Sequence, residues 1–149
     1  MNLLGLMAIL GFILIFLVLV VIKIIFISLL QSTLNEISPQ NRLVSKNNLW
    51  FLLIPFLGNI YNFIVIPKLA DSLKLEFSER NISVDDPRPG YNLGITYSIL
   101  FFLCLVFIFI GRFNPFFNTF LKPCVIAEFI FFICYCAKIS IYKKKLLEN

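Results

Sequence analysis

Long apolar blocks are the feature that most restricts how this chain can fold. The first block runs from Leu3 to about Leu30 and is interrupted only by Lys23 and Ser28. A run of ~20 apolar residues is enough for a helix to cross a bilayer. The block is much longer than the ~7–15-residue core of a secretory signal peptide, and no small-residue cleavage site follows it. We therefore expect a retained transmembrane helix over about residues 3–30.

Three further apolar blocks follow, over about residues 49–66, 93–110 and 124–142. Hydrophobic residues make up 60% of the 149 residues and charged residues only 14%, whereas a soluble domain carries ~25% charged residues. Almost no residues remain for a separate soluble domain. The sequence therefore predicts an all-α integral membrane fold, with four transmembrane helices in one domain over residues 1–149.

The segment after the second block is amphipathic and no longer continuously apolar. Leu69, Leu73 and Phe77 fall on one face of a helix, and charged residues such as Lys74 lie away from that face. This pattern predicts a short amphipathic helix over about residues 68–81. Such a helix either lies on the bilayer surface or packs on the rest of the protein.

The second block also contains residues that a simple membrane anchor does not need. Asn59 and Asn62 are three positions apart and share a helix face, and Tyr61 adds a hydroxyl. Amides in hydrocarbon need partners, so this face should meet protein or water. Gly58 permits a close backbone approach, and Pro55 favours a kink. Two interpretations remain open: polar packing between helices, or the lining of a pore or substrate site.

Two ionisable residues interrupt the apolar blocks. Lys23 lies about seven residues before the end of the first block, and Glu128 about five residues after the start of the fourth. With four crossings, the two lie at similar depths on the same side and form a candidate intramembrane pair. Charges at mid-bilayer cost at least ~2.5–3.5 kcal/mol. Either the side chains snorkel or pair for structural reasons, or the pair guards an ion or proton path.

The sequence offers little for catalysis. It has no histidine, which removes the commonest general base and metal ligand. The cysteines, Cys104, Cys124, Cys134 and Cys136, have neither metal-site nor disulfide-framework spacing, and we interpret them as apolar packing residues. There is no catalytic triad motif and no phosphate-binding glycine loop. We therefore expect no enzymatic activity, cofactor or metal site.

The distribution of cations predicts an orientation. With four crossings, the termini and the 68–92 loop lie on one side, which holds eight cations: Lys68, Lys74, Arg80, Arg88, Lys138, Lys143, Lys144 and Lys145. The other loops hold four: Arg42, Lys46, Arg112 and Lys122. The positive-inside rule then places both termini in the cytoplasm, in an inner (plasma) membrane. The run Lys143, Lys144 and Lys145 is expected to contact anionic lipid and not nucleic acid, because no domain presents it.

Three stretches carry a family resemblance: ISPQNRLVSKNNLWFLLIPFLGNIYNFIVIPKLADSLKLEF, RPGYNLGITYSIL and CAKISIYKKKL. Their shared elements are a polar Asn-Arg loop, a Trp- and Pro-containing helix ending in S-L-x-x-E-F, a G-x-N-L-G helix start and a K-I-x-x-Y-K-x-x-L ending. Over roughly residues 36–147, the chain resembles a group of small bacterial four-helix membrane proteins of unknown function. The resemblance implies a fold and no activity.

These patterns lead to two main functional hypotheses, with a membrane sensor whose 68–92 loop meets a cytoplasmic partner as a third. The first is a non-enzymatic multi-pass membrane protein that acts by protein–protein contact, as an accessory or assembly subunit of a membrane complex or by self-association. The alternative is a small oligomeric channel or carrier, with a polar path near Asn59 and Asn62 and near Lys23 and Glu128. The first hypothesis expects co-isolation with other subunits, and the second expects transport that depends on Asn59.

Overall fold

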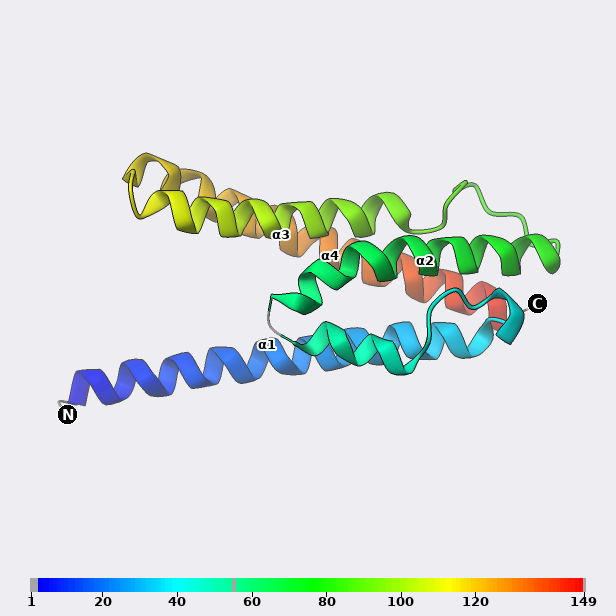
Figure 1. The fold of residues 1–149 in the computed structure, drawn as a ribbon, viewed down its shortest axis with the longest axis horizontal. Helices are drawn as coiled ribbons and strands as arrows, with labels where there is room; N and C mark the ends of the chain where they lie inside the picture. The colour runs from blue at the N-terminus through cyan, green and yellow to red at the C-terminus, as the bar shows by residue number, and fades with distance from the viewer. Residues whose placement is uncertain (1–2, 55, 149) are drawn as a thin grey trace.

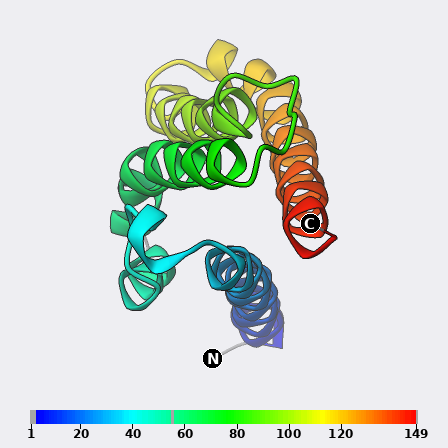
Figure 2. The same ribbon diagram turned by 90° about the vertical axis from the view of Figure 1, so that its right-hand side faces the viewer.

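The computed structural model describes residues 3–54 and 56–148. Within them, four α-helices make up most of the chain: α1 (Leu3–Glu36), α2 (Leu57–Glu79), α3 (Tyr91–Gly111) and α4 (Asn118–Leu147). Short 3-10 helices lie in the connections: η1 (Pro39–Asn41), η2 (Asn47–Leu53) and η3 (Pro115–Phe117). Viewed from the end that carries the C-terminus, α1, η2, α2, α3 and α4 follow one another around the molecule (Figure 2).

Three helical stretches among the described residues are long and apolar enough to cross a membrane: Gly5–Glu36, Tyr91–Gly111 and Pro115–Leu147. They contain almost all of the first, third and fourth predicted blocks, so these three predictions are confirmed as candidate membrane helices. α1, α3 and α4 all run along the long axis of the molecule (Figure 1). α3 runs antiparallel to the other two, and the N- and C-termini therefore lie at opposite ends.

The prediction of a fourth transmembrane helix, over residues 49–66, is wrong. η2 runs inward beside α1 and ends at Leu53, and α2 begins at Leu57 and returns toward the end from which η2 came (Figure 1). We call this unit, residues 47–66, the η2–α2 hairpin. Hydropathy reports that a segment is apolar, but it does not report whether the chain reverses within it.

The local backbone explains why the helix is interrupted. Ile54 precedes a proline and is extended, with ψ 121°, as the steric clash with a following proline ring favours. Phe56 has φ 62° and ψ −57°, a combination outside the right-handed helical region. Pro55, which was predicted to kink this helix, lies outside the described residues.

The predicted boundary between residues 66 and 68 is also wrong, because α2 continues through Pro67. The amphipathic helix expected at 68–81 is therefore the second half of α2. Its apolar residues Leu69, Leu73 and Phe77 are buried, so this segment packs on the protein instead of resting alone on a bilayer surface. As an interior proline, Pro67 removes one backbone hydrogen bond from this helix.

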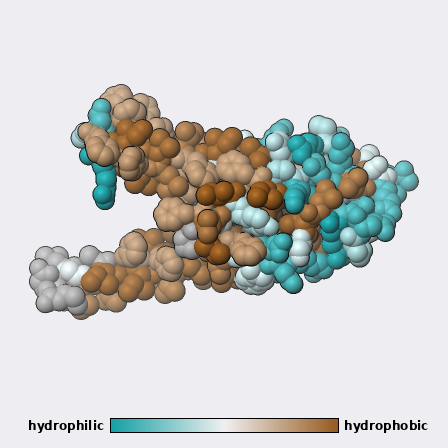
Figure 3. Space-filling view, in the orientation of Figure 1, coloured by the Kyte–Doolittle hydropathy of each residue, from teal (hydrophilic) through white to brown (hydrophobic). Residues whose placement is uncertain are grey.

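The molecule has a packed half and a splayed half. Toward the C-terminal end, α1, α2, α3 and α4 share a core that includes Phe26, Leu30, Leu73, Tyr97 and Tyr135. Toward the other end, α1 stands away from α3 and α4 (Figure 1). We call residues 5–22 of α1 the N-terminal arm, and α3 with α4 the α3–α4 hairpin. Figure 3 shows a deep notch between these two hydrophobic parts, whereas the opposite end is largely hydrophilic.

A candidate intramembrane polar cavity

A cavity of about 560 Å³ lies where the N-terminal arm, the η2–α2 hairpin and the α3–α4 hairpin meet, at the base of the notch. Most of its lining is apolar, with aromatic rings from each of these parts: Phe16, Phe56, Phe101, Phe129 and Phe132. Its polar lining comes from Lys23, Asn59, Tyr97 and Glu128. The fold thus gathers residues from four separate segments around one mostly apolar space.

Lys23 and Asn59 meet in this cavity. The Lys23 ammonium donates a hydrogen bond to Oδ1 of Asn59, at 2.9 Å. α1 supplies the lysine, and the first turns of α2 supply the asparagine. The contact is possible because the η2–α2 hairpin reverses at the depth of Lys23. A hydrogen bond to a charged group contributes about 1.5–3 kcal/mol, so this bond helps to hold the hairpin against α1.

Glu128 enters the same cavity from α4. Its charge interacts with that of Lys23, but no direct ion pair joins them among the described side chains. The lysine's described hydrogen bond goes to Asn59 instead. The candidate pair predicted from matching depths therefore stays a prediction, now with both partners on the wall of one cavity. Together the two groups make the cavity neutral when both are ionised.

Tyr97 is a cavity residue that sequence reasoning missed. Its side chain is only 2% exposed, and its ring packs against Phe132 and Tyr135, with centroids 5.5 and 5.7 Å away. Its hydroxyl has no hydrogen-bond partner among the residues that the structure describes. Nothing in the sequence separates it from the many other aromatic residues of the apolar blocks, because its position depends on how α3 packs against α4.

The other residues singled out in the second block take different positions. Asn62 is 1% exposed and its Oδ1 has no described partner, and it does not line the cavity with Asn59. The Tyr61 ring packs on Phe51 from η2, at 5.9 Å between centroids. At Gly58, a Cβ would overlap the main-chain carbonyl of Leu52. Tyr61 and Gly58 thus lie in contact with η2, and they hold the two arms of the η2–α2 hairpin together.

A second polar site surrounds Glu76, near the hydrophilic end. Its carboxylate accepts hydrogen bonds from Ser38 N (2.9 Å), Ser38 Oγ (2.9 Å) and Asn41 Nδ2 (2.8 Å). Arg80 Nε donates a further bond at 2.8 Å and forms an ion pair with it. The Glu76 side chain is 1% exposed. These contacts tie the polar Asn-Arg loop after α1 to the S-L-x-x-E-F stretch of α2.

The same contacts set the ionisation of Glu76. Burial favours the neutral acid, but the hydrogen bonds from Asn41, Ser38 and Arg80 outweigh it and lower the pKa of the Glu76 carboxyl below its ordinary value. Arg80 also donates to the main-chain carbonyls of Leu146 and Glu36, at 2.9 and 2.8 Å. One guanidinium thus joins the C-terminal ends of α1, α2 and α4, and its role is structural.

A further ion pair also lies at the hydrophilic end. Arg88 forms a bidentate pair with Asp71, at 3.0 and 2.9 Å, and its guanidinium stacks 4.1 Å from the centroid of the Tyr91 ring. This pair fixes the loop between α2 and α3. Within the described ranges, no three His, Cys, Asp or Glu side chains gather where they could hold a metal ion.

Comparison with family models, with curated proteins and with solved structures finds no match for this chain. The geometry described above therefore carries the functional argument by itself.

Proposed function

We propose that this chain is a non-enzymatic, multi-pass inner-membrane protein that acts by protein–protein contact, as an accessory subunit of a membrane complex or by self-association. The observation that supports this proposal is the exposure of apolar side chains along the N-terminal arm. Most of its described side chains are apolar and strongly exposed, for example Phe12 at 73%, Leu14 at 65% and Ile15 at 63%. In a bilayer, such a helix gains packing energy from another helix that lies against it.

The proposed topology has three crossings and one re-entrant segment. α1, α3 and α4 cross the bilayer, and the η2–α2 hairpin enters and leaves on the same side. α1 has 34 residues, or about 50 Å at ~1.5 Å per residue, so it projects beyond a hydrocarbon core of ~30 Å. This arrangement replaces the expected four-crossing topology, and the two termini lie on opposite sides.

With three crossings, the cation distribution becomes more asymmetric. Among the described cations, only Arg112 and Lys122 lie at the end where α1 begins: Arg112 directly follows α3, and Lys122 is near the start of α4. Ten lie toward the opposite end: Arg42, Lys46, Lys68, Lys74, Arg80, Arg88, Lys138, Lys143, Lys144 and Lys145. By the positive-inside rule, the hydrophilic end faces the cytoplasm. Lys143, Lys144 and Lys145 then lie near the anionic cytoplasmic leaflet.

Reporter fusions test this topology. We expect fusions after residue 148 and within the loop at residues 82–88 to report the cytoplasm, because both sites lie at the cation-rich end. A fusion within the α3–α4 turn, at residues 113–114, should report the opposite side, as should one placed before α1. The N-terminal fusion separates the alternatives: a cytoplasmic signal there would restore the four-crossing topology and contradict the proposal.

Site-specific photo-crosslinking tests the contact function. We expect a photoreactive amino acid at Leu14, on the N-terminal arm, to give protein adducts in native membranes, because this helix face is free for another helix. The matched control is Ile130 on α4, which is similarly apolar and 55% exposed. An adduct of twice the chain mass indicates self-association, and one of another mass indicates a partner subunit. If Leu14 yields no more protein adduct than Ile130, the contact proposal fails.

The alternative of a channel or carrier draws support from one observation, namely that Lys23, Asn59 and Glu128 line the same cavity. Asn62 does not take part, so the predicted polar path is shorter than expected. Hydrated ions need a continuous polar path, and most of this lining is aromatic or aliphatic. The observation therefore favours the binding of an amphiphile over ion conduction.

A further inference from the structure

We propose that the polar cavity is a binding site for an uncharged glycerolipid of the diacylglycerol type. Its hydroxyl and ester groups would meet Lys23, Tyr97, Asn59 and Glu128, and its acyl chains would leave through the notch. This site is independent of the protein contacts proposed for the N-terminal arm, because it uses the inner wall of the notch and not the outer faces of α1.

The polar groups of the cavity are incompletely satisfied by the protein. The Lys23 ammonium has three N–H donors, and one of them is used by Asn59. The Tyr97 hydroxyl is buried and has no described partner, and an unsatisfied buried group costs about 1–3 kcal/mol. Glu128 adds an acceptor. The site thus offers donors for ester or hydroxyl oxygens and an acceptor for a ligand O–H, within one small volume.

Charge balance selects the kind of head group. Lys23 and Glu128 both line the cavity, so their charges cancel when both groups are ionised, and neither is charged when both are neutral. A head group with a net negative charge would bring that charge into a cavity that also holds Glu128, and one with a net positive charge would bring it into a cavity that also holds Lys23. Like charges that meet in a medium of low dielectric repel strongly. A neutral head with one free hydroxyl avoids both costs and can pair with donors and acceptor together.

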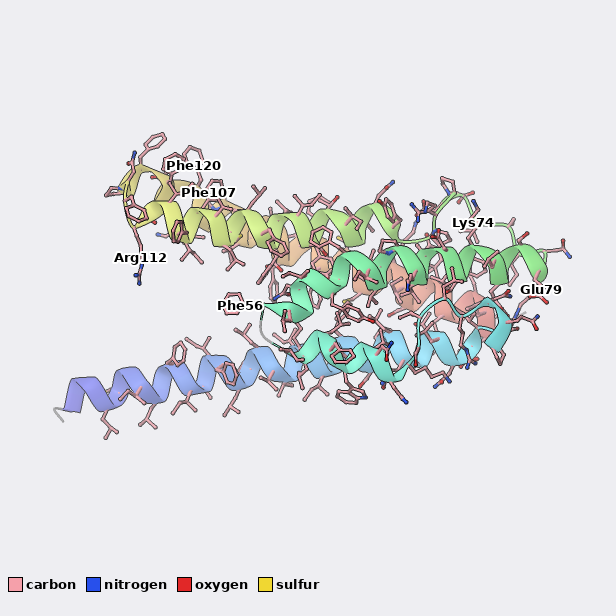
Figure 4. All side chains as sticks on the ribbon, viewed as in Figure 1. Phe56, Lys74, Glu79, Phe107, Arg112 and Phe120 are labelled. Carbon is pink, nitrogen blue, oxygen red and sulfur yellow. The ribbon has the colours of Figure 1, made fainter. Side chains whose placement is uncertain are left out.

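The shape of the site fits a head group with its upper acyl chains. The cavity volume of about 560 Å³ is within the ~300–1,000 Å³ that is usual for sites of small ligands. It opens toward the notch, whose walls are the apolar N-terminal arm and the α3–α4 hairpin (Figure 3). Phe56, at the tip of the η2–α2 hairpin, points into the space between α1 and α3 (Figure 4). Its ring lies where acyl chains would leave the cavity.

The test uses the full chain in phosphatidylcholine vesicles that contain a small amount of a diacylglycerol with a photoactivatable diazirine in one acyl chain. After illumination, adducts are mapped by peptide mass spectrometry. We expect them to concentrate on the notch walls, around Phe16 and Phe101, and to be competed by unlabelled dioleoylglycerol. Tyr97→Phe removes only the hydroxyl and should lower this labelling about fivefold. Glu128→Gln, which weakens the acceptor, should lower it as well.

Tyr61→Phe is the matched control, because it removes the same atom from a tyrosine that does not line the cavity, and its labelling should equal that of the unmodified chain. Thermal unfolding in detergent checks that each variant is folded. The proposal is overturned if labelling is unchanged in both Tyr97→Phe and Glu128→Gln. It is equally overturned if phosphatidylcholine or phosphatidic acid probes with the same chain label the notch as well as diacylglycerol does, or if a protein segment, and no lipid, crosslinks to the notch walls. None of these results depends on whether Leu14 crosslinks to protein.

Discussion

Replacing Glu76 with glutamine is expected to lower the free energy of unfolding by about 3 kcal/mol, which is typical when one member of a buried charge pair is removed. The glutamine amide keeps one acceptor oxygen but places an N–H₂ donor where donors already converge from Ser38, Asn41 and Arg80. The Arg80 guanidinium also loses its ionic partner. The measurement is unfolding by SDS in mixed micelles, followed by circular dichroism and by the fluorescence of Trp50.

The matched control is Glu148→Gln, which breaks an exposed pair in which the Lys144 and Glu148 groups are 3.5 Å apart. Surface pairs contribute about 0–1 kcal/mol, so this variant should unfold nearly as the unmodified chain does. Equal behaviour of the Glu76 and Glu148 variants would show that the carboxylate of Glu76 does not hold the loop to α2.

Glu76 also makes stability depend on pH in a defined direction. Because folding lowers the pKa of this carboxyl, its stabilising contribution is present above the pKa of the unfolded chain. That contribution is lost as the pH falls through the folded-state pKa, below the ~4.3 of a free glutamic acid side chain. The unmodified chain should therefore lose stability on acidification in this range, and Glu76→Gln should lose correspondingly less.

Gly58→Val is expected to disrupt the η2–α2 hairpin, at a cost of about 3 kcal/mol. A Cβ at this position would overlap the main-chain carbonyl of Leu52, and a backbone group cannot move aside as a flexible side chain does. Asn59 would then lose its place beside Lys23. Unfolding in mixed micelles gives the stability, and the accessibility of a cysteine at position 59 to a water-soluble maleimide, in a background without other cysteines, reports the position of the hairpin.

Gly11→Val is the control for this substitution, because a Cβ at Gly11 meets nothing within 4 Å. It changes a helix residue of the N-terminal arm without altering any contact within the chain. If Gly11→Val and Gly58→Val lower the free energy of unfolding equally, the effect comes from replacing a glycine in general. The close approach of Gly58 to Leu52 would then not contribute to stability.

The sequence predicts the elements that depend on local composition. α1, α3 and α4 are found where long apolar blocks are, because continuous apolar character is itself the condition for a membrane helix. It does not predict the reversal at Ile54 and Phe56, since a hairpin and a straight span of the same residues have the same hydropathy. The resemblance to four-helix membrane proteins suggests four helices, and it does not distinguish four crossings from three with a hairpin.

The residues of the candidate site also fall into those that the sequence predicts and those that it does not. Lys23 and Glu128 could be recognised because charges in apolar blocks are rare and costly, and Asn59 because an amide in hydrocarbon needs a partner. Tyr97 could not, because an aromatic residue with a buried hydroxyl is recognisable only once its neighbours are known. The helical spacing allows Glu76 to pair with Arg80, and the structure has this pair. The contacts of Glu76 with Ser38 and Asn41 could not be predicted, because they depend on how the loop after α1 folds over α2.

The clustering of charge at one end of the molecule has a consequence for biosynthesis. In the proposed topology, this end faces the cytoplasm. Arg112 and Lys122 are then the only Lys, Arg, Asp or Glu residues between the start of α3 and Glu128, and they lie in or beside the turn that would pass through the bilayer. α3 and α4 can therefore be inserted together as a preformed pair, with only two cations to be translocated. The η2–α2 hairpin needs no translocation, so it can settle against α1 from the side on which it is synthesised, after the crossing helices are in place.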